Sequence, residues 1–503
     1  MIMQLLYSFF ANSLQSVDLP MRRAPSTSAA VEPLLSDFHF KSLLYNCVME
    51  AEIVFKRKFY AKLLKWKSET NGTTAALIEG ARRIGKSTLC KEFAKNEYVS
   101  YILIDFNLAG DDVKSLFELY LNDLDTFFMM LSTIYGIKLI EHKSLIIFDE
   151  VQLFPKARSA IKYLVKDNRY DYIETGSLVS IKKNVKEIQI PSEERHIKMN
   201  PMDFEEFCWA MGDDTTVPFL RHIFETHSEL GSAHRKINTL FRQYLIVGGM
   251  PKAVETFVNT RDFEKIDRIK RDILTLYRND IQKYADKDVE KVTAIFDEIP
   301  SQLQKHDRVF RLSDLEEEAR FRGYEDAFFW LKDSGIITPC YNTTEPSVGL
   351  KMNKERTTMK CFMADTGLLI SHTSDKNGIV SNEIYKKLML DKLSVNFGNI
   401  MENIVAQMLT AKGHSLYFYT NSSRNDASSR MKIDFLVSKT TITNKHNIFP
   451  LEIKTGKNYT LSSLKKFIAK FPDQLCEPFV FHDGEFKIEN GITYMPIYMA
   501  MCL

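Results

Sequence analysis

No stretch of this sequence has the roughly 18 or more consecutive apolar residues that a membrane-spanning helix needs. The apolar run at residues 5–11 is short, and no Lys or Arg precedes it, so it is a poor match to a secretory signal peptide. We therefore expect no membrane partner.

The cysteines lack any pairing pattern. They are seven in number, they are scattered along the chain, and none lies in a C-x-x-C pair. This distribution argues against a zinc ribbon and is typical of proteins from a reducing compartment, so we expect a cytoplasmic location.

The chain also lacks an excess of either charge. Its 67 basic and 65 acidic residues give a net charge of +2, so any nucleic-acid site has to be a local patch. Aromatic residues make up 12% of the sequence, which argues against disorder over most of the chain. The length of 503 residues suggests about two to four domains.

One short stretch carries a complete phosphate-loop motif. Residues 80–87 match G-x-x-x-x-G-K-[ST], with an apolar run at 75–78 before them and helical spacing at 87–93 after them. The backbone N–H groups of such a loop surround phosphate oxygens, and the start of the helix adds positive potential. The alternative is a structural glycine turn before a helix. The residues that we expect to bind the nucleotide are Gly80, Ala81, Arg82, Arg83, Ile84, Gly85, Lys86, Ser87 and Thr88.

A second pattern supplies the other half of an ATP site. Residues 144–150 form an apolar run that ends in Asp149 and Glu150, as in a buried parallel strand whose carboxyl end faces a ligand. Lys86 would reach the β- and γ-phosphates, and the Ser87 hydroxyl would ligate Mg²⁺. Asp149 would hold Mg²⁺ through water, and Glu150 would activate the hydrolytic water as a general base. The alternative is a strand that simply ends in charged residues.

Three further residues are candidates for sensing the γ-phosphate. One predicted strand ends at Thr175 and Ser177, where related ATPases carry a polar sensor, although a plain turn is the alternative. The predicted last strand carries Arg195, a candidate arginine finger whose alternative is a surface arginine. We predict an α/β fold with a parallel five-stranded sheet of the P-loop NTPase type. Its strands are expected at 75–78, 101–106, 144–150, 172–177 and 194–201.

The middle of the chain is predicted to be mainly helical. Residues 206–285, interrupted by the Gly-Gly-Met-Pro breaker, are expected to form a helical lid over the nucleotide. Residues 286–350 show three helical stretches and a short strand, the pattern of a winged-helix unit, with Ser313 as the cap of the second helix. The candidate recognition helix at 325–332 is acidic and aromatic, which favours protein contact over reading of the DNA major groove.

Four charged residues near the C-terminus suggest a second chemical site. Glu402 lies in a predicted helix, and Asp434, Glu452 and Lys454 lie in two predicted strands. This order of helix and strands is that of the PD-(D/E)xK nuclease core, where carboxylates bind one or two divalent metals and the lysine assists the attacking water. Lysines between 454 and 470 form a face through which we expect any DNA contact. The alternatives are a nuclease-like fold without activity and ordinary strand-end charges.

Together with motifs at 201–207, 247–251 and 277–281, these features resemble the bacterial and archaeal AAA-type ATP-binding proteins that carry a C-terminal domain of unknown function. The resemblance covers roughly residues 49–503. It implies an AAA core with a catalytic glutamate, a winged-helix-like unit and a restriction-endonuclease-like domain. Lys432 is a departure, because similar proteins often carry an acidic residue there, and a positive charge beside a metal site weakens metal binding.

The sequence therefore predicts five segments and one main function. Mg²⁺-dependent ATP hydrolysis would drive or switch a DNA-associated C-terminal module, and a homo-oligomer is expected. The alternatives are an ATP-gated, metal-dependent nuclease and a nucleotide-switched protein-binding regulator without DNA contact. Met49 is a candidate for the native start. The segments are a loosely ordered extension at 1–48, a P-loop ATPase core at 49–205, the lid at 206–285, the winged-helix-like unit at 286–350, and a linker with the nuclease-like domain at 351–503.

Overall fold

The computed structural model describes most of the chain after residue 52. The described ranges are 53–177, 190–305, 307–347, 349–373, 381–389, 397–421, 429–439, 446–456 and 458–503. The predicted extension at 1–48 and the candidate start at Met49 lie outside them. Residues Val54–Leu503 form one compact unit. Every helix in the described ranges is too short or too polar to span a lipid bilayer.

The first sheet has five strands, and every strand pair in it is parallel. The strand order is β2-β3-β4-β1-β5, so the predicted parallel five-stranded sheet is confirmed. The carboxyl ends of β1, β3 and β4 therefore lie at one edge, where ligands of such sheets bind. The strands are β1 (Ala75–Glu79), β2 (Ser100–Asp105), β3 (Ser144–Asp149), β4 (Asp171–Gly176) and β5 (Glu194–Lys198).

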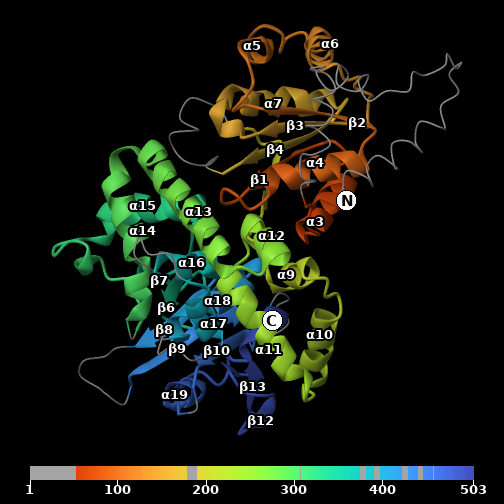
Figure 1. Ribbon diagram of the computed structural model, residues 1–503. Helices are drawn as coiled ribbons and strands as arrows, with labels where there is room; N and C mark the ends of the chain where they lie inside the picture. The colour runs from red at the N-terminus through yellow and green to blue at the C-terminus, as the bar shows by residue number, and fades with distance from the viewer. Residues whose placement is uncertain are drawn as a thin grey trace, which may run out of the picture. The chain divides into compact units, whose positions relative to one another are not determined.

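Helices cover both faces of this sheet, because alternate residues of the strands pack to opposite sides. In β3, Ile147 packs in the core with α3 (Phe59–Thr70) and α4 (Lys86–Glu97). Phe148 packs on the other side, in the core with α5 (Asp111–Leu119), α6 (Leu124–Tyr135) and α7 (Pro155–Asp167). Figure 1 shows these three helices on one side of the sheet and α3 and α4 on the other. Helix α6 starts separately from α5 because the Asp123 carboxylate accepts the Thr126 N–H and caps its first turn.

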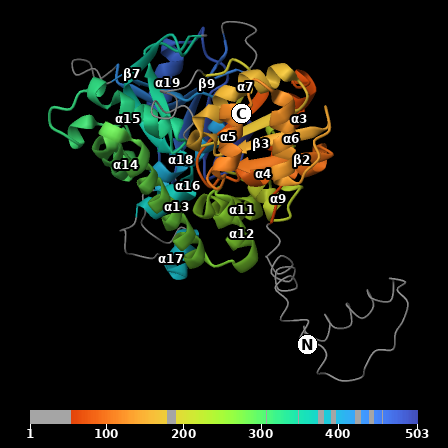
Figure 2. The same cartoon turned by 90° about the horizontal axis from the view of Figure 1, so that it is seen from above.

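The helical segment after β5 is interrupted at one tightly packed point. Met202 donates its N–H to the Gly249 carbonyl at 2.8 Å, and a Cβ on Gly249 would lie 2.1 Å from the Met202 oxygen. Only glycine permits this approach, so the break between α11 and α12 is fixed against the connection that follows β5. Figures 1 and 2 show α11, α12 and α13 beside one another. The helices are α9 (Phe204–Ala210), α10 (Thr216–Thr226), α11 (Ala233–Val247), α12 (Pro251–Thr260) and α13 (Phe263–Tyr284).

The region expected to hold three helices contains two α-helices, α14 (Val289–Gln304) and α15 (Phe321–Asp333). Between them lies a single 3₁₀ turn, η5 (Leu312–Asp314), and Ser313 makes no capping hydrogen bond there. The Gln302 side chain explains this difference, since it donates to Asp314 at 2.7 Å and accepts the Arg311 N–H at 3.0 Å. These bonds hold the connection against the end of α14, and no middle helix extends.

The second sheet has eight strands in the order β12-β13-β11-β10-β9-β8-β6-β7. Its hairpin β6–β7 joins the rest through parallel pairing of β6 with β8, so the strands expected in the winged-helix-like unit share a sheet with the C-terminal region. The strands are β6 (Ile337–Thr343), β7 (Lys354–Met363), β8 (Tyr417–Asn421), β9 (Met431–Ser438), β10 (Ile448–Lys454), β11 (Phe479–His482), β12 (Lys487–Glu489) and β13 (Ile492–Pro496). The remaining helices are α16 (Thr366–His372), α17 (Asn382–Met389), α18 (Phe397–Ala411), α19 (Ser462–Lys470) and the 3₁₀ helix η6 (Ile497–Cys502).

The close approach at Gly249 predicts a large effect of one methyl group. Gly249→Ala should lower the free energy of unfolding by about 1–3 kcal/mol or more, because backbone atoms of Met202 occupy the space. Gly323→Ala is the matched control, since a Cβ there would lie 3.9 Å from the Lys291 amine and helix α15 favours alanine. Chemical denaturation measures both. Equal stabilities for the two variants would contradict the packing described here.

Candidate functional site

The phosphate loop joins β1 to α4 in an unusual backbone conformation. Gly80 and Gly85 have φ values of 152° and 91°, and Arg83 has a φ of 66°. A Cβ on Gly80 would lie 2.4 Å from the Met199 carbonyl oxygen. Glycine is therefore needed at position 80 both for its φ and for the close packing of the loop on the backbone that follows β5.

Lys86 places a buried cation inside this loop. Its Nζ donates to the carbonyl oxygens of Gly80 and Ala81, both at 2.9 Å. Burial lowers the pKa of Lys86 to about 8, and the nearby carboxylates of Glu150 and Asp149 oppose that shift. The positive charge of Lys86 is thus only partly balanced by nearby carboxylates, and it lies within the loop where a phosphate anion is expected.

Asp149 at the end of β3 gathers two hydroxyl groups. Ser87 Oγ donates to Asp149 Oδ1 at 2.8 Å, and the Thr175 hydroxyl at the end of β4 donates to the same oxygen. Thr175 Oγ1 also accepts the Glu150 N–H at 3.2 Å. Hydroxyl and carboxylate oxygens are the ligands that Mg²⁺ prefers, so the residues present fit the predicted cation. The structure brings the predicted Ser87, Asp149 and Thr175 together.

Glu150 follows β3 in a left-handed backbone conformation, with a φ of 53°. Its side chain is partly exposed, and its carboxylate accepts a hydrogen bond from the Gln152 amide. The Glu150 carboxylate therefore lies at the same edge of the sheet as the phosphate loop. Sequence reasoning did not single out Gln152, although its position two residues after Glu150 was a local signal.

Two of the predicted sensor residues have a different environment. The Ser177 hydroxyl is buried and has no hydrogen-bond partner among the described residues. Arg195 pairs with Ala76 in the sheet register, before the carboxyl end of β1, and its guanidinium forms an ion pair with Glu69 at 2.7 Å. The structure therefore does not bring Arg195 to the phosphate loop. Its action on a neighbouring subunit stays a prediction.

Sequence reasoning missed Arg57, a buried side chain that supports the loop. Arg57 Nη1 donates to the Ile84 carbonyl at 2.8 Å, and its Nη2 donates to the Asn200 carbonyl at 2.8 Å. Its Nε lies 3.1 Å from a carboxylate oxygen of Glu206 in α9. One guanidinium thus joins the loop, the connection after β5 and the next helix.

Helix α13 also contacts the loop. Arg82 Nη1 lies 2.6 Å from Asp280 Oδ1, and the Tyr277 hydroxyl donates to the Arg82 carbonyl at 3.2 Å. Burial raises the pKa of Asp280, Arg82 opposes that rise, and the Glu150 carboxylate adds to it. Asp280 therefore responds to charge in the loop and at Glu150.

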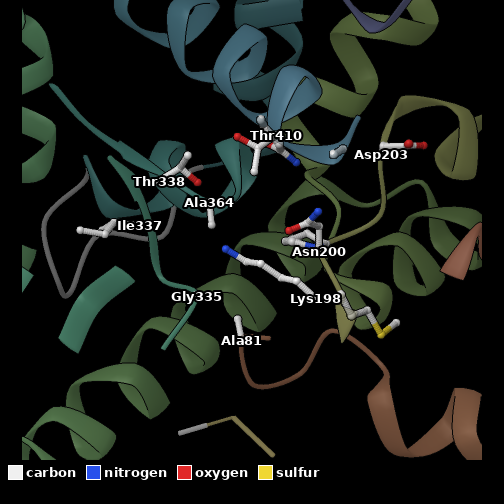
Figure 3. Close-up of a pocket in the computed structure, with 13 residues that line it drawn as sticks. Ala81, Lys198, Asn200, Asp203, Gly335, Ile337, Thr338, Ala364 and Thr410 are labelled. Carbon is white, nitrogen blue, oxygen red and sulfur yellow. The ribbon is translucent and has the colours of Figure 1, made fainter. Parts of the chain in front are cut away.

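A turn before the second sheet packs on the other side of Arg82. Gly335 has a φ of 73°, and a Cβ there would lie 2.8 Å from the Ala81 backbone nitrogen. Beside this contact is a small pocket, shown in Figure 3, which Ala81, Lys198 and Gly335 line together with residues of α18. The loop is therefore in direct contact with residues that lead into β6.

The four charged residues predicted near the C-terminus also come together, but around another cation. Lys360 of β7 is fully buried, and its Nζ lies 3.1 Å from Glu402 Oε2 and 3.7 Å from Asp434 Oδ1. Lys454 Nζ lies 2.5 Å from Glu452 Oε2. Within the described ranges, no group of three or more His, Cys, Asp or Glu residues is arranged to hold a metal ion. The residues present therefore do not fit the predicted divalent metals.

Family models match three parts of the chain. Residues 72–208 match the AAA domain, which supports an AAA-type ATPase. Residues 238–377 and 397–500 match two domains of unknown function, DUF8612 and DUF4143. No curated protein matches the chain.

Several solved structures resemble the chain weakly. The Walker-type ATPase PABY2304 of Pyrococcus abyssi is 14% identical, covers 64% of this chain and 97% of its own, and has a TM-score of 0.38. The Thermotoga maritima RuvB Holliday junction branch migration motor is 13% identical over 56% of this chain and 89% of its own, with a TM-score of 0.26. The STAND protein PH0952 from Pyrococcus horikoshii is 11% identical over 71% of this chain and 48% of its own, with a TM-score of 0.24.

The lowered pKa of Lys86 predicts a pH dependence of nucleotide affinity. Above pH 8 the free loop loses the Lys86 proton, and a bound phosphate has to restore it. ATP affinity should therefore fall between pH 7.5 and pH 9, by up to about tenfold per pH unit above the pKa. Calorimetry in buffers of different ionisation enthalpy should detect proton uptake. Lys86→Arg, which stays charged, should show affinity independent of pH in this range, and a pH-independent wild type would contradict the prediction.

Proposed function

We propose that this chain, in which residues 72–208 match an AAA domain, binds ATP with Mg²⁺ and hydrolyses it. The observation that carries the proposal is the convergence of Ser87, Asp149 and Thr175 beside the buried Lys86. A structural glycine turn would need neither a buried ammonium nor an aspartate shared by two hydroxyls. The site residues are assigned roles as follows.

The loop N–H groups and the Lys86 ammonium bind phosphate oxygens and stabilise the charge that moves to them during transfer. Glu150 orients a water molecule and takes its proton. The water oxygen forms a bond to the γ-phosphorus, and the bond from that phosphorus to the bridging oxygen breaks, which yields ADP and inorganic phosphate. Mg²⁺, held by Ser87 and Asp149, would neutralise phosphate charge. Thr175 holds Asp149 in place through its hydrogen bond.

We further propose that the nucleotide state of the loop is passed to the C-terminal region. The support is the contact of Arg82 with Asp280 and Tyr277 and of Ala81 with Gly335. These partners lie in α13 and directly before β6. A bound phosphate would replace the hydrogen bonds that Lys86 makes to the loop carbonyls. If the loop then changes shape, α13 and the turn before β6 have to move with it or lose contact with it.

No contact in the described ranges favours DNA as the target of this switching, and DNA association remains a hypothesis to test. ATP hydrolysis measured with and without double-stranded DNA on one preparation separates the possibilities. If DNA stimulates ATP hydrolysis and the stimulation declines as the salt concentration rises, the result supports a DNA-associated module. An unchanged rate favours a regulator that acts on another protein.

Glu150→Gln should reduce ATP hydrolysis by about 10²- to 10⁴-fold, because the general base is removed. ATP binding should persist in this variant, since Glu150 is not a phosphate ligand. Lys86→Ala should lose both binding and hydrolysis. Phosphate release and calorimetry measure these effects.

Lys91→Ala is the matched control, because Lys91 is an exposed lysine of the same helix α4. It should leave both measurements unchanged. Full ATP binding and turnover in Lys86→Ala would overturn the proposed function.

The coupling makes a separate prediction for Asp280→Asn. In the wild type, a non-hydrolysable ATP analogue should slow hydrogen exchange in α13 and β6, because the loop and its partners become ordered together. In Asp280→Asn, analogue binding should persist but the change in α13 should be much smaller, because the ion pair to Arg82 is lost. Arg268→Ala, an exposed position on α13 whose bond to Glu264 stays within that helix, is the control. Equal exchange patterns in wild type and Asp280→Asn would refute this route of coupling.

A further inference from the structure

The charged cluster in the second sheet contains more cations than carboxylates. Its three carboxylates belong to Glu402 of α18, Asp434 of β9 and Glu452 of β10, and all three are buried. Its cations are Arg308, Lys360, Lys432 and Lys454. Four cationic side chains therefore surround three carboxyl groups before any metal is considered, and burial raises the pKa of Glu452 to about 8.

Protein cations and N–H groups already occupy the carboxylate oxygens of Glu402 and Asp434. Glu402 Oε1 accepts from Arg308, and Glu402 Oε2 lies 3.1 Å from Lys360 Nζ. Asp434 Oδ1 lies 3.7 Å from Lys360 Nζ and 3.5 Å from Lys432 Nζ, and Asp434 Oδ2 accepts the Ile453 N–H at 3.1 Å.

Glu452 leaves one carboxylate oxygen of the cluster open. Its Oε2 lies beside Lys454, whereas its Oε1 is buried and has no partner among the described residues. Oxygen-ligated divalent cations require several oxygen lone pairs. A single open oxygen supplies too few of them, and a divalent cation would have to compete with the protein's own cations at the other carboxylate oxygens.

Lys360 lies at the centre of this arrangement. It has no exposed surface, its Nζ also donates to the Asp434 carbonyl at 3.3 Å, and the rings of Phe418 and Phe435 are 5.1 Å and 5.5 Å away. Burial disfavours its charge, but the Glu402 and Asp434 carboxylates raise the pKa of Lys360 above its ordinary value. Those carboxylates thus hold a permanent ammonium ion between them.

We propose that the Lys360 ammonium takes the position that a divalent cation would have between Glu402 and Asp434, so that this region works without a metal and without nuclease chemistry. The cluster then serves as a structural joint. It connects β7, α18, β9 and β10, and through Arg308 it includes the segment that follows α14. This inference does not rest on ATP hydrolysis and can fail or succeed independently of it.

The test is Mn²⁺ binding by the full-length chain without nucleotide, counted by electron paramagnetic resonance. Asp149→Asn serves as the background, since it removes the charged one of the two expected metal ligands of the ATP site, Ser87 and Asp149. In this background we expect no bound Mn²⁺ at millimolar concentration. A bound ion that further substitution of Asp434→Asn removes would overturn the proposal, as would Mn²⁺-dependent DNA cleavage by the wild type that Asp434→Asn abolishes.

Lys360→Met, which is similar in size but uncharged, tests whether removal of the ammonium creates a metal site. In the same background it should unfold at a lower temperature, because two buried carboxylates lose a partner. It should also gain one bound Mn²⁺ and recover several degrees of thermal midpoint with that ion, and adding Asp434→Asn should abolish the gain. A folded Lys360→Met variant that binds no Mn²⁺ would overturn the assignment of Lys360 to the cation position. If it does not fold, the binding and cleavage measurements without this substitution still decide the question.

Discussion

The backbone of the phosphate loop is enclosed by close contacts on several sides, and the rest of the structure depends on this constraint. Gly80 packs on the Met199 carbonyl, and Arg57 holds the Ile84 carbonyl. Asp280 holds Arg82, and Gly335 packs on Ala81. Each contact comes from a different part of the chain, so the loop cannot change conformation without displacing at least one of them.

This enclosure gives the loop two functions that a glycine loop alone would lack. It keeps the Lys86 ammonium buried against the carbonyl oxygens of Gly80 and Ala81. Its attraction to a phosphate anion is stronger there than in water, because the dielectric constant is lower. It also places Asp280 within electrostatic reach of both Arg82 and Glu150. Charge that enters the loop therefore acts on Asp280 of α13 directly, and the proposed coupling needs no long pathway.

The sequence predicted the first sheet well, because buried parallel strands are continuous apolar runs and β1 and β3 have that pattern. It also predicted that Ser87 and Asp149 would lie close together, since the phosphate loop after β1 and the acidic end of β3 are at the same edge of the sheet. It could not predict Arg57 as a partner of the loop, because an ordinary charged residue 27 positions away carries no local signal. Asp280 lies in the motif at 277–281, but that motif did not indicate a contact with Arg82, which is 198 positions away.

The departures from expectation have similar causes. The pairing register places Arg195 before the carboxyl end of β1, where Glu69 of α3 is its partner, so its role as an arginine finger stays a prediction. The three-helix pattern failed because the Gln302 side chain holds the following connection in place. Both outcomes depend on contacts between residues that are distant in sequence or on side-chain direction, and neither follows from helical or strand periodicity.

A comparison of the two aspartate sites explains why one suits a divalent cation and the other does not. The partners of Asp149 include two hydroxyl groups, from Ser87 and Thr175. A hydroxyl is both donor and acceptor, so it can rotate and turn a lone pair toward an incoming cation. The neighbours of Asp434 include the ammonium groups of Lys360 and Lys432, which have no lone pair to offer and repel a second cation. Similar carboxylates on buried strands thus differ in chemistry, because the hydroxyl groups beside Asp149 can turn from hydrogen-bond donors into metal ligands and the ammonium groups beside Asp434 cannot.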